Sequence, residues 1–339
     1  MQRASMQSPW RLWGLLIGLG LFGAGAAQAH VRWFTDPNDP MLASFPTYAL
    51  TDPAVLIWLG IATALIATAI FLDGRLPSPP IIQSKYRHDA IELLRIFTGM
   101  SLLLTAYGGQ LLAPHLLAYG GFGTALVFLQ ALIGILLISN NLVHHAAILT
   151  GILYMGAMVK FGFALTIEYV NVIGIALFLF FNYVPDERLR MRLKPYSVDM
   201  LRIFTGIALI ALGLGEKLLG AVLGQSFMAI YAWNFMPALG LEWYSDQLFV
   251  LSAGMVEVTF GIIMVLGVVT RLNTFVISAF MLLSNVVFLV QNQNENALIE
   301  LIGHMPTIAS ALILLLLGFG QRLKVGLPIL RRPSPLPAE

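Results

Sequence analysis

The chain has 339 residues, of which 58% are hydrophobic and 11% are charged, and its formal net charge is +2. Soluble domains carry about a quarter charged residues, so this composition excludes a soluble globular protein and predicts an all-α polytopic membrane protein. The chain has no cysteine, which excludes disulfides, thiol catalysis and thiolate metal sites. Redox chemistry would therefore need a quinone, a bound cofactor or a non-thiolate metal.

The first 29 residues have the pattern of a secretory signal peptide. Arg3 and Arg11 form a basic start, residues 12–26 form an apolar core, and Ala27-Gln28-Ala29 is a small-x-small cleavage site. Cleavage there would leave His30 as the mature amino terminus, in the periplasm. The alternative is a signal anchor that is not cleaved.

About nine stretches after the signal are long and apolar enough to cross a bilayer, which takes about 20 residues. They are 53–72, 89–112, 121–139, 142–160, 163–182, 197–221, 246–268, 272–291 and 298–320. Residues 30–52 precede them as an N-terminal arm, and residues 321–339 follow them as a tail rich in proline and charge.

The placement of lysine and arginine predicts the orientation. If the spans alternate from an outer His30, fourteen of these residues fall on the cytoplasmic side and only Arg32, Lys160 and Lys217 fall outside. Cytoplasmic loops carry this excess of positive charge. We therefore expect a protein of the bacterial inner (plasma) membrane, with a periplasmic mature amino terminus and a cytoplasmic carboxy terminus.

A hexapeptide occurs twice in the chain. Leu94-Arg95-Ile96-Phe97-Thr98-Gly99 returns as Leu201-Arg202-Ile203-Phe204-Thr205-Gly206. The likeness continues further along, where Gln130 aligns with Glu257 and Glu168 aligns with Glu300. Such self-similarity predicts a tandem duplication, with copies at 89–182 and 197–320 and an extra helix at 53–72.

Each copy is predicted to hold four helices. An even number of spans between the equivalent residues Arg95 and Arg202 gives both copies the same orientation, so the repeat is a parallel one related by an axis along the membrane normal.

The second copy resembles the DoxX family of four-helix membrane proteins. The resemblance rests on the early Arg202, on Lys217 at the end of the first helix, on Glu257 in the second helix and on Thr270-Arg271 after it. The first copy resembles a degenerate relative, which has Gln110 where Lys217 would fall and Gln130 in place of Glu257. The resemblance implies an association with quinone or redox chemistry, like that of the related thiosulfate:quinone oxidoreductase subunit. Membership of a family indicates the class of protein and does not establish the reaction.

Three ionisable residues inside the predicted spans are the candidate catalytic groups. Glu257 lies about 15 Å along its helix, a depth that suits proton exchange. Alternatively, its only role is a hydrogen bond that holds two helices together. Glu300 and His304 are four residues apart and share a helix face, so they could pass protons or hold a quinone head group. Their alternative is a solvated helix start, with Glu300 at the positive end of the helix dipole.

The basic residues divide into two predicted roles. The family motif assigns Lys217 and Arg271 to substrate binding, whereas a snorkelling Lys217 would need no function. Lys217 could also pair with Glu257 or with Glu300 across the bundle. Arg95 and Arg202 are predicted to be structural: they snorkel to the cytoplasmic surface, or they tie helices together through a carbonyl or an acid. Lys160 and Glu168 are interpreted as a structural pair.

His30 is a candidate metal ligand. A mature amino-terminal histidine offers its amine and its imidazole together, which suits copper, and only His115 and His304 lie on the same side as a second histidine ligand. The aromatic segment 225–245 is predicted to anchor the chain at the bilayer interface or to cover the second bundle as a lid.

Three functions are compatible with these residues. The first is a redox-linked protein that handles a quinone near the outer face, with a membrane or periplasmic redox partner. The second is a non-enzymatic scaffold or assembly factor for such a partner. The third is a small-solute transporter, which parallel repeats and midplane acids allow, although no Gly/Pro break occurs at matching positions of both copies.

Overall fold

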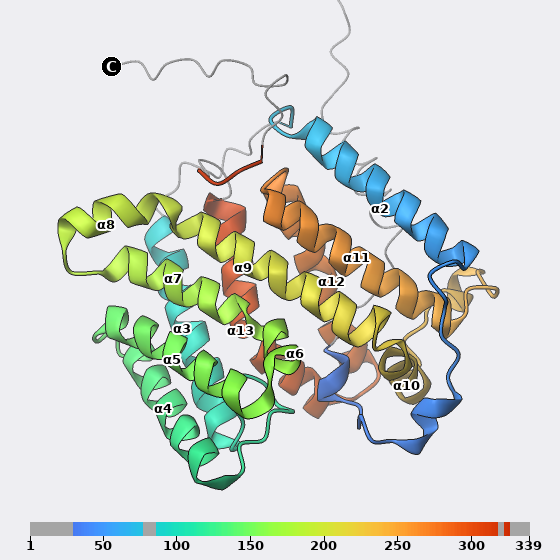
Figure 1. Ribbon diagram of the computed structural model, residues 1–339, viewed down its shortest axis with the longest axis horizontal. Coiled ribbons are helices and arrows are strands. Elements are labelled where there is room, and N and C mark those ends of the chain that lie inside the picture. Colours follow the sequence, from blue (N-terminus) through green and yellow to red (C-terminus); the bar gives the residue numbers. More distant parts are fainter. Residues whose placement is uncertain (1–29, 77–85, 318–321, 326–339) are drawn as a thin grey trace, which may run out of the picture.

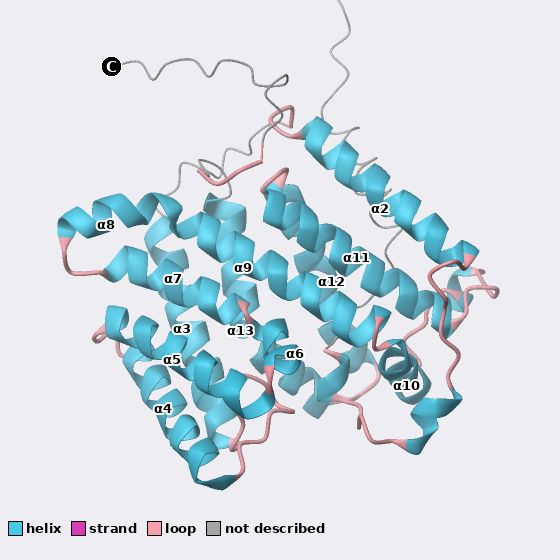
Figure 2. Ribbon diagram, viewed as in Figure 1, coloured by secondary structure: helices cyan, strands magenta, loops and turns pink. Residues whose placement is uncertain are grey.

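The computed structural model describes residues 30–76, 86–317 and 322–325. The predicted signal peptide, residues 77–85 and most of the tail lie outside these residues. All named elements in the described part are helical (Figures 1 and 2). This agrees with the all-α prediction.

The N-terminal arm, residues 30–52, contains two 3-10 helices, η1 (Val31–Trp33) and η2 (Pro40–Ser44). The α-helices that follow are α2 (Pro53–Leu72), α3 (Tyr86–Tyr107), α4 (Gly120–Ile138), α5 (Val143–Phe161), α6 (Phe163–Thr166), α7 (Asn171–Tyr183), α8 (Glu187–Leu193), α9 (Ser197–Leu212), α10 (Ala221–Tyr231), α11 (Asp246–Leu266), α12 (Thr270–Val290) and α13 (Asn294–Leu317). A π-helical turn, η6 (Gly213–Leu218), continues α9, and a 3-10 turn, η4 (Ile167–Tyr169), joins α6 to α7.

Within the described residues, seven helices are long and apolar enough to cross a membrane, or eight if a bent pair counts as one span. The bent pair is Phe163–Tyr169 with Asn171–Tyr183, which meet at 50° where the sequence predicts one straight span. Helix α5 is not among the seven, and it carries His144, His145 and Lys160 near its ends. The structure thus supports a polytopic membrane protein with fewer qualifying spans than the nine predicted.

The helices of the two predicted copies pack in matching pairs. In the first copy α3 packs on α4 and α5 packs on α7; in the second copy α9 packs on α11 and α12 packs on α13. The two predicted copies also pack against each other. Helix α13 of the second copy packs on α3 of the first, and α7 of the first packs on α9 of the second. Figure 1 shows α9 and α11 side by side across the middle of the molecule.

Glycines allow the same close crossing in both halves. A Cβ atom added at Gly99 would lie 2.9 Å from the carbonyl oxygen of Gly134, and one added at Gly206 would lie 2.8 Å from that of Gly261. Small residues let membrane helices approach until their backbones touch. These four glycines are the ones that the repeated sequence aligns.

Arg95 and Arg202 tie the first two helices of each copy together at the end of the bundle that we call the arginine end. Arg202 is fully buried and donates to the carbonyl oxygens of Met264, of Val265 at 2.6 Å and of Leu323 at 2.6 Å. Arg95 likewise donates to the carbonyl oxygens of Leu137 and Ile138. The last carbonyls of a helix have no partner within the helix, so both arginines act as helix-tying residues and do not simply snorkel.

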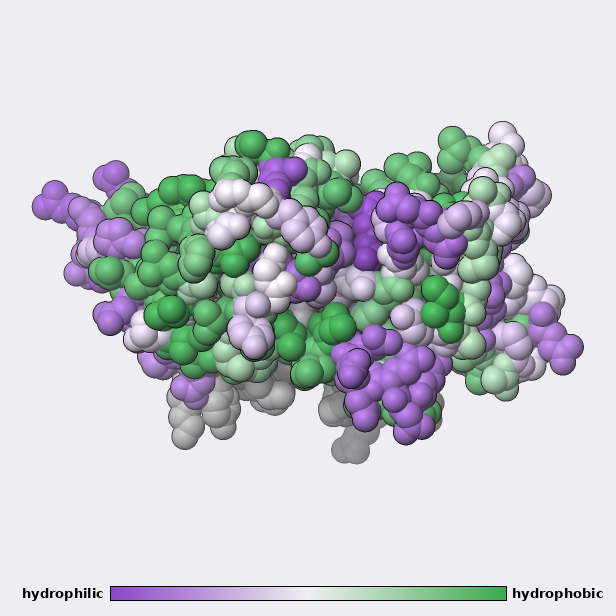
Figure 3. Space-filling view, turned by 90° about the horizontal axis from the view of Figure 1, so that it is seen from below, coloured by the Kyte–Doolittle hydropathy of each residue, from purple (hydrophilic) through white to green (hydrophobic). Residues whose placement is uncertain are grey.

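The surface has the apolar character that a bilayer requires. Large side chains such as Phe122, Phe128 and Ile135 on α4 are exposed. Figure 3, a view from below Figure 1, shows hydrophobic residues over much of the left of the molecule and hydrophilic residues gathered towards the middle and right. Contiguous apolar surface of this kind suits a lipid environment.

Candidate functional site

The N-terminal arm inserts its first residues into the helix bundle. His30 and Val31 are buried, and the main-chain amide of Val31 donates to Oε2 of Glu216 at 2.7 Å. The amide of Arg32 donates to the other oxygen of the same carboxylate at 3.3 Å. Glu216 lies on the π-helical turn η6, and π turns of this kind re-aim side chains and occur often at functional sites. We call this end of the bundle the arm end.

Arg32 holds the arm through a second buried carboxylate. Its guanidinium lies 3.1 Å from Glu168 Oε1 and donates to the carbonyl oxygen of Gly215 at 3.2 Å. The predicted pair between Lys160 and Glu168 is therefore wrong. The bend before α7 places Glu168 inside the bundle, whereas Lys160 stays near the surface and donates to the carbonyl oxygen of Tyr119.

Rings from the arm, from η4 and from α13 meet beside these carboxylates. The His30 and Trp33 rings are stacked with centroids 4.2 Å apart, and the His304 ring lies 5.2 Å from that of His30. Trp33 Nε1 donates to the hydroxyl of Tyr169 at 2.9 Å. That hydroxyl lies 3.5 Å from Nδ1 of His115. The three histidines that were predicted to lie on the outer side are therefore all found close to Tyr169 or Trp33.

The two histidines outside the helical spans are neutral at neutral pH. Burial, with a contribution from the positive charge of Arg32, lowers the pKa of His115 to about 4. Burial is also the largest cause that holds the pKa of His30 well below its ordinary value, followed by the nearby His304. Neutral imidazoles keep a lone pair free to accept a proton, a hydrogen bond or a metal.

Glu300 and His304 face inward. Oε1 of Glu300 accepts a hydrogen bond from Ser284 at 3.1 Å and lies 3.4 Å from Nδ1 of His304. Glu300 is 0% exposed and His304 is 4% exposed. The solvated helix start is therefore wrong, because the packing of α13 against α3 and α12 covers this face.

Lys217 and Glu257 form a separate buried ion pair. The ammonium of Lys217 lies 2.8 Å and 3.0 Å from the two oxygens of Glu257, as one of the predicted pairings requires. Glu216 points away towards the arm, as expected for an adjacent helical residue. In the first copy, Gln130 takes the place of Glu257 and is satisfied by hydrogen bonds to neutral groups, among them the amide of Leu112.

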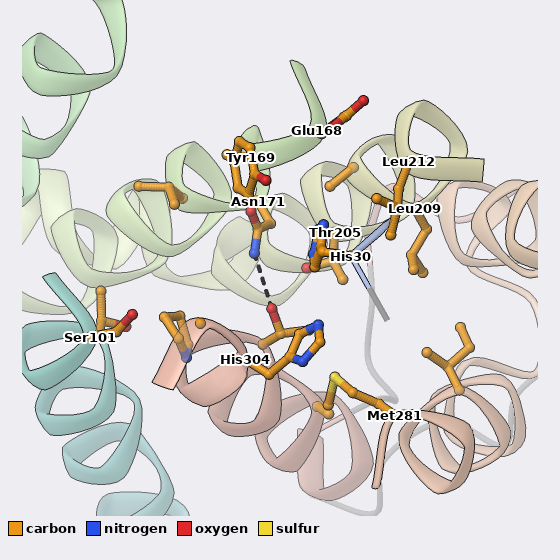
Figure 4. Close-up of a pocket in the computed structure, with 18 of the residues that line it drawn as sticks. His30, Ser101, Glu168, Tyr169, Asn171, Thr205, Leu209, Leu212, Met281 and His304 are labelled. Atoms are coloured by element: carbon orange, nitrogen blue, oxygen red, sulfur yellow. Dashed lines mark hydrogen bonds between the residues drawn. The ribbon is translucent and has the colours of Figure 1, made fainter. Parts of the chain in front are cut away.

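A cavity lies among α3, α7, α9, α12 and α13 and reaches the arm end. Figure 4 shows His30, Tyr169, Asn171, Thr205 and His304 around it, and leucine and methionine side chains continue its wall. The volume inside it that the centre of a water-sized molecule can occupy is about 70 Å³.

The cavity brings together only some of the predicted site residues. His30 and His304 line it, whereas Lys217, Glu257 and Glu300 do not. Glu168, which was predicted only as part of a structural pair, lines it as well. Asn171 donates to Thr307 at 3.3 Å across it, and sequence reasoning missed this contact because neither residue belongs to a motif.

Arg271 takes part in a different structural contact. It donates to the carbonyl oxygens of Leu315 at 2.7 Å and Leu316 at 2.9 Å, near the end of α13, and it is not among the residues that line the cavity. Its predicted role in substrate binding rests on the resemblance alone.

The aromatic segment 225–245 divides into two parts. Phe227 and Trp233 are buried and pack in one cluster with Val31 and Phe34 of the arm, while Trp243 is 70% exposed. The buried part therefore supports the arm, and the exposed part remains available for the predicted interfacial anchoring.

No group of three or more His, Asp or Glu side chains is placed to hold a metal ion, as far as the described residues go. The family model DoxX matches residues 197–290, which is less than half of the chain and covers α9 to α12. This region contains Lys217 and Glu257 but neither Glu300 nor His304. Comparisons with curated proteins and with solved structures gave no match.

Proposed function

We propose that the chain is a tandem pair of DoxX-like repeats in the inner membrane, and that the cavity between them binds the head group of a quinone. The matched segment supports the class, and the matching helix pairs and glycine crossings support the duplication. In this proposal the arm end faces the periplasm, as the lysine and arginine distribution predicts.

The single observation that carries the proposal is the composition of the cavity wall. His30, Tyr169 and His304 supply polar groups at the arm end, and leucines such as Leu102 and Leu314 supply much of the rest, where a few hydroxyl groups such as that of Thr205 also lie. Ligand sites are typically apolar clefts with a few placed polar groups that fix orientation. A quinone head group has two carbonyl oxygens on an otherwise apolar ring, so it complements such a wall.

The buried acids have different roles in this proposal. Glu300 and His304 are the proton-handling pair, because His304 lines the cavity and Glu300 lies behind it. Glu257 is a positioning residue, since its carboxylate is held by Lys217 away from the cavity. Electrons would pass to or from a separate membrane or periplasmic redox partner.

Quinone binding by the purified protein tests this proposal. We expect a short-chain ubiquinone to bind to the wild-type protein in detergent, and Leu209→Trp, which fills the cavity, to weaken binding at least tenfold. The control is Leu219→Trp, because Leu219 is 85% exposed. We also expect His304→Leu to weaken binding, by removing one hydrogen-bonding group worth about 1.5 kcal/mol, which is about tenfold.

Equal binding by Leu209→Trp and wild-type protein would contradict the proposed site. No binding of any quinone, and no turnover with any quinol or sulfur donor, would contradict the function and favour the scaffold alternative.

A further inference from the structure

Among the described residues, two buried imidazole nitrogens at the arm end lack a hydrogen bond of good geometry. They are Nδ1 of His30, which lies 4.0 Å from Glu216 Oε1, and Nδ1 of His304, which lies 3.4 Å from Oε1 of Glu300 on its own helix. Buried polar atoms are nearly always paired, so each unpaired one requires an explanation, such as a redox role or an ion. The two rings are neighbours and line one cavity, so a single ligand within that cavity could contact both.

The separation of the two rings suits a bridging metal ion. Their centroids are 5.2 Å apart and the rings are tilted by 32°. A metal–imidazole bond is about 2 Å long, so two such bonds with the ring radii span about 5–6 Å, depending on the angle at the metal. The separation of the two ring centroids is therefore compatible with one shared ion.

The third donor is supplied by the main chain. If the signal is cleaved after Ala29, His30 gains a free α-amine, and this amine and its Nδ1 chelate one metal ion together. The absence of a three-side-chain cluster in the described part of the protein does not bear on this set, which needs only two side chains. Met281 lines the same cavity and offers a thioether, a soft ligand that favours Cu(I) (Figure 4).

We propose that the mature amino terminus and His304 form a copper site. His30 supplies its amine and Nδ1, His304 supplies one imidazole nitrogen, and Met281 is an additional soft ligand. Nitrogen donors bind copper(II) more tightly than the other divalent first-row metals, which favours copper over zinc. The Glu216 carboxylate lies 4.0 Å from His30 Nδ1 and would offset the positive charge of the ion.

The arm is held in a way that fixes this site. The two amides after His30 are bound by Glu216, Arg32 is bound by Glu168, and Trp33 stacks on the His30 ring. Gly303 leaves room for Trp33, since a Cβ atom there would lie 2.1 Å from the indole. Metal sites need such outer groups to orient their ligands. The inference does not depend on quinone binding.

Copper binding by the full-length, processed protein tests the proposal. Mass spectrometry of the mature chain is expected to show His30 as its first residue. We expect one copper per chain, with nitrogen hyperfine structure in the Cu(II) EPR spectrum. His304→Gln, and an alanine inserted between Ala29 and His30, are each expected to weaken binding at least 100-fold.

The control is His145→Gln, because His145 is exposed near the start of α5 and is expected to leave copper binding unchanged. Variants are compared only when they elute as folded protein and when the inserted residue is present in the mature mass. A mature chain that begins elsewhere, binding that is unchanged in His304→Gln, or no copper in the wild-type protein would each overturn the proposal.

Discussion

Lys217→Met is expected to lower the free energy of unfolding in detergent by about 3–5 kcal/mol, because it leaves the Glu257 carboxylate buried and without its ammonium partner. Both side chains are buried, with Glu257 at 0% exposure. A lone charge inside a membrane bundle is costly, so the variant must protonate Glu257 or open the packing between η6 and α11. This loss is measured by titrating SDS into the protein in mild detergent and comparing the free energies of reversible unfolding of the variant and the wild type.

The double variant Lys217→Met, Glu257→Met separates a structural pair from a catalytic one. Replacing a whole buried ion pair with apolar side chains is often neutral for stability. We therefore expect the double variant to recover most of the loss, and to bind quinone like the wild type if Glu257 only positions its neighbours. A double variant as unstable as Lys217→Met would contradict the pairing.

Arg202→Met is expected to cost about 3–5 kcal/mol, because hydrogen bonds from a charged donor contribute about 1.5–3 kcal/mol each and several are lost together. The guanidinium also pairs at 3.1 Å with Asp199, which is 0% exposed. Removing it leaves the carboxylate with the main-chain amide of Arg322 as its remaining partner among the described residues. Loss of folded protein on mild heating in detergent checks the prediction.

Arg95→Met is the matched control in the other copy. Arg95 makes the same contacts with helix-end carbonyls, but its acidic partner Glu92 is 23% exposed and also accepts a hydrogen bond from Tyr183. The carboxylate left behind is therefore better solvated, and we expect a loss of about half that of Arg202→Met. A larger loss for Arg95→Met would contradict this account of the two arginines.

The sequence predicted the helical class because this class depends on local pattern. Apolar runs of about 20 residues mark membrane spans, and the repeated hexapeptide led us to expect similar surroundings for Arg95 and Arg202. Lys217 was expected to pair with Glu257 or with Glu300, because it ends its helix at the outer face of the same bundle, and the structure pairs it with Glu257.

The composition of the cavity could not be predicted, because it depends on contacts between segments far apart in the sequence. Glu168 was paired with the nearest cation along the chain, whereas the bend at η4 turns it towards Arg32. Tyr169 and Asn171 belong to no motif, and only the packing of α7 and α13 brings Asn171 to Thr307. The insertion of the arm likewise depends on Glu216, whose partners are main-chain amides and leave no trace in the sequence.

The central claim is that the arm is docked inside the bundle beside the cavity, and the lack of cysteine in the chain makes this claim directly testable. Val31 is 2% exposed and Asp36 is exposed, so single-cysteine variants at these positions can be labelled with a membrane-impermeant maleimide on intact spheroplasts. We expect Val31→Cys to react at least 100-fold more slowly than Asp36→Cys, and Glu216→Ala to remove that protection. Equal labelling of the two positions in an otherwise wild-type chain would show that the arm is not docked.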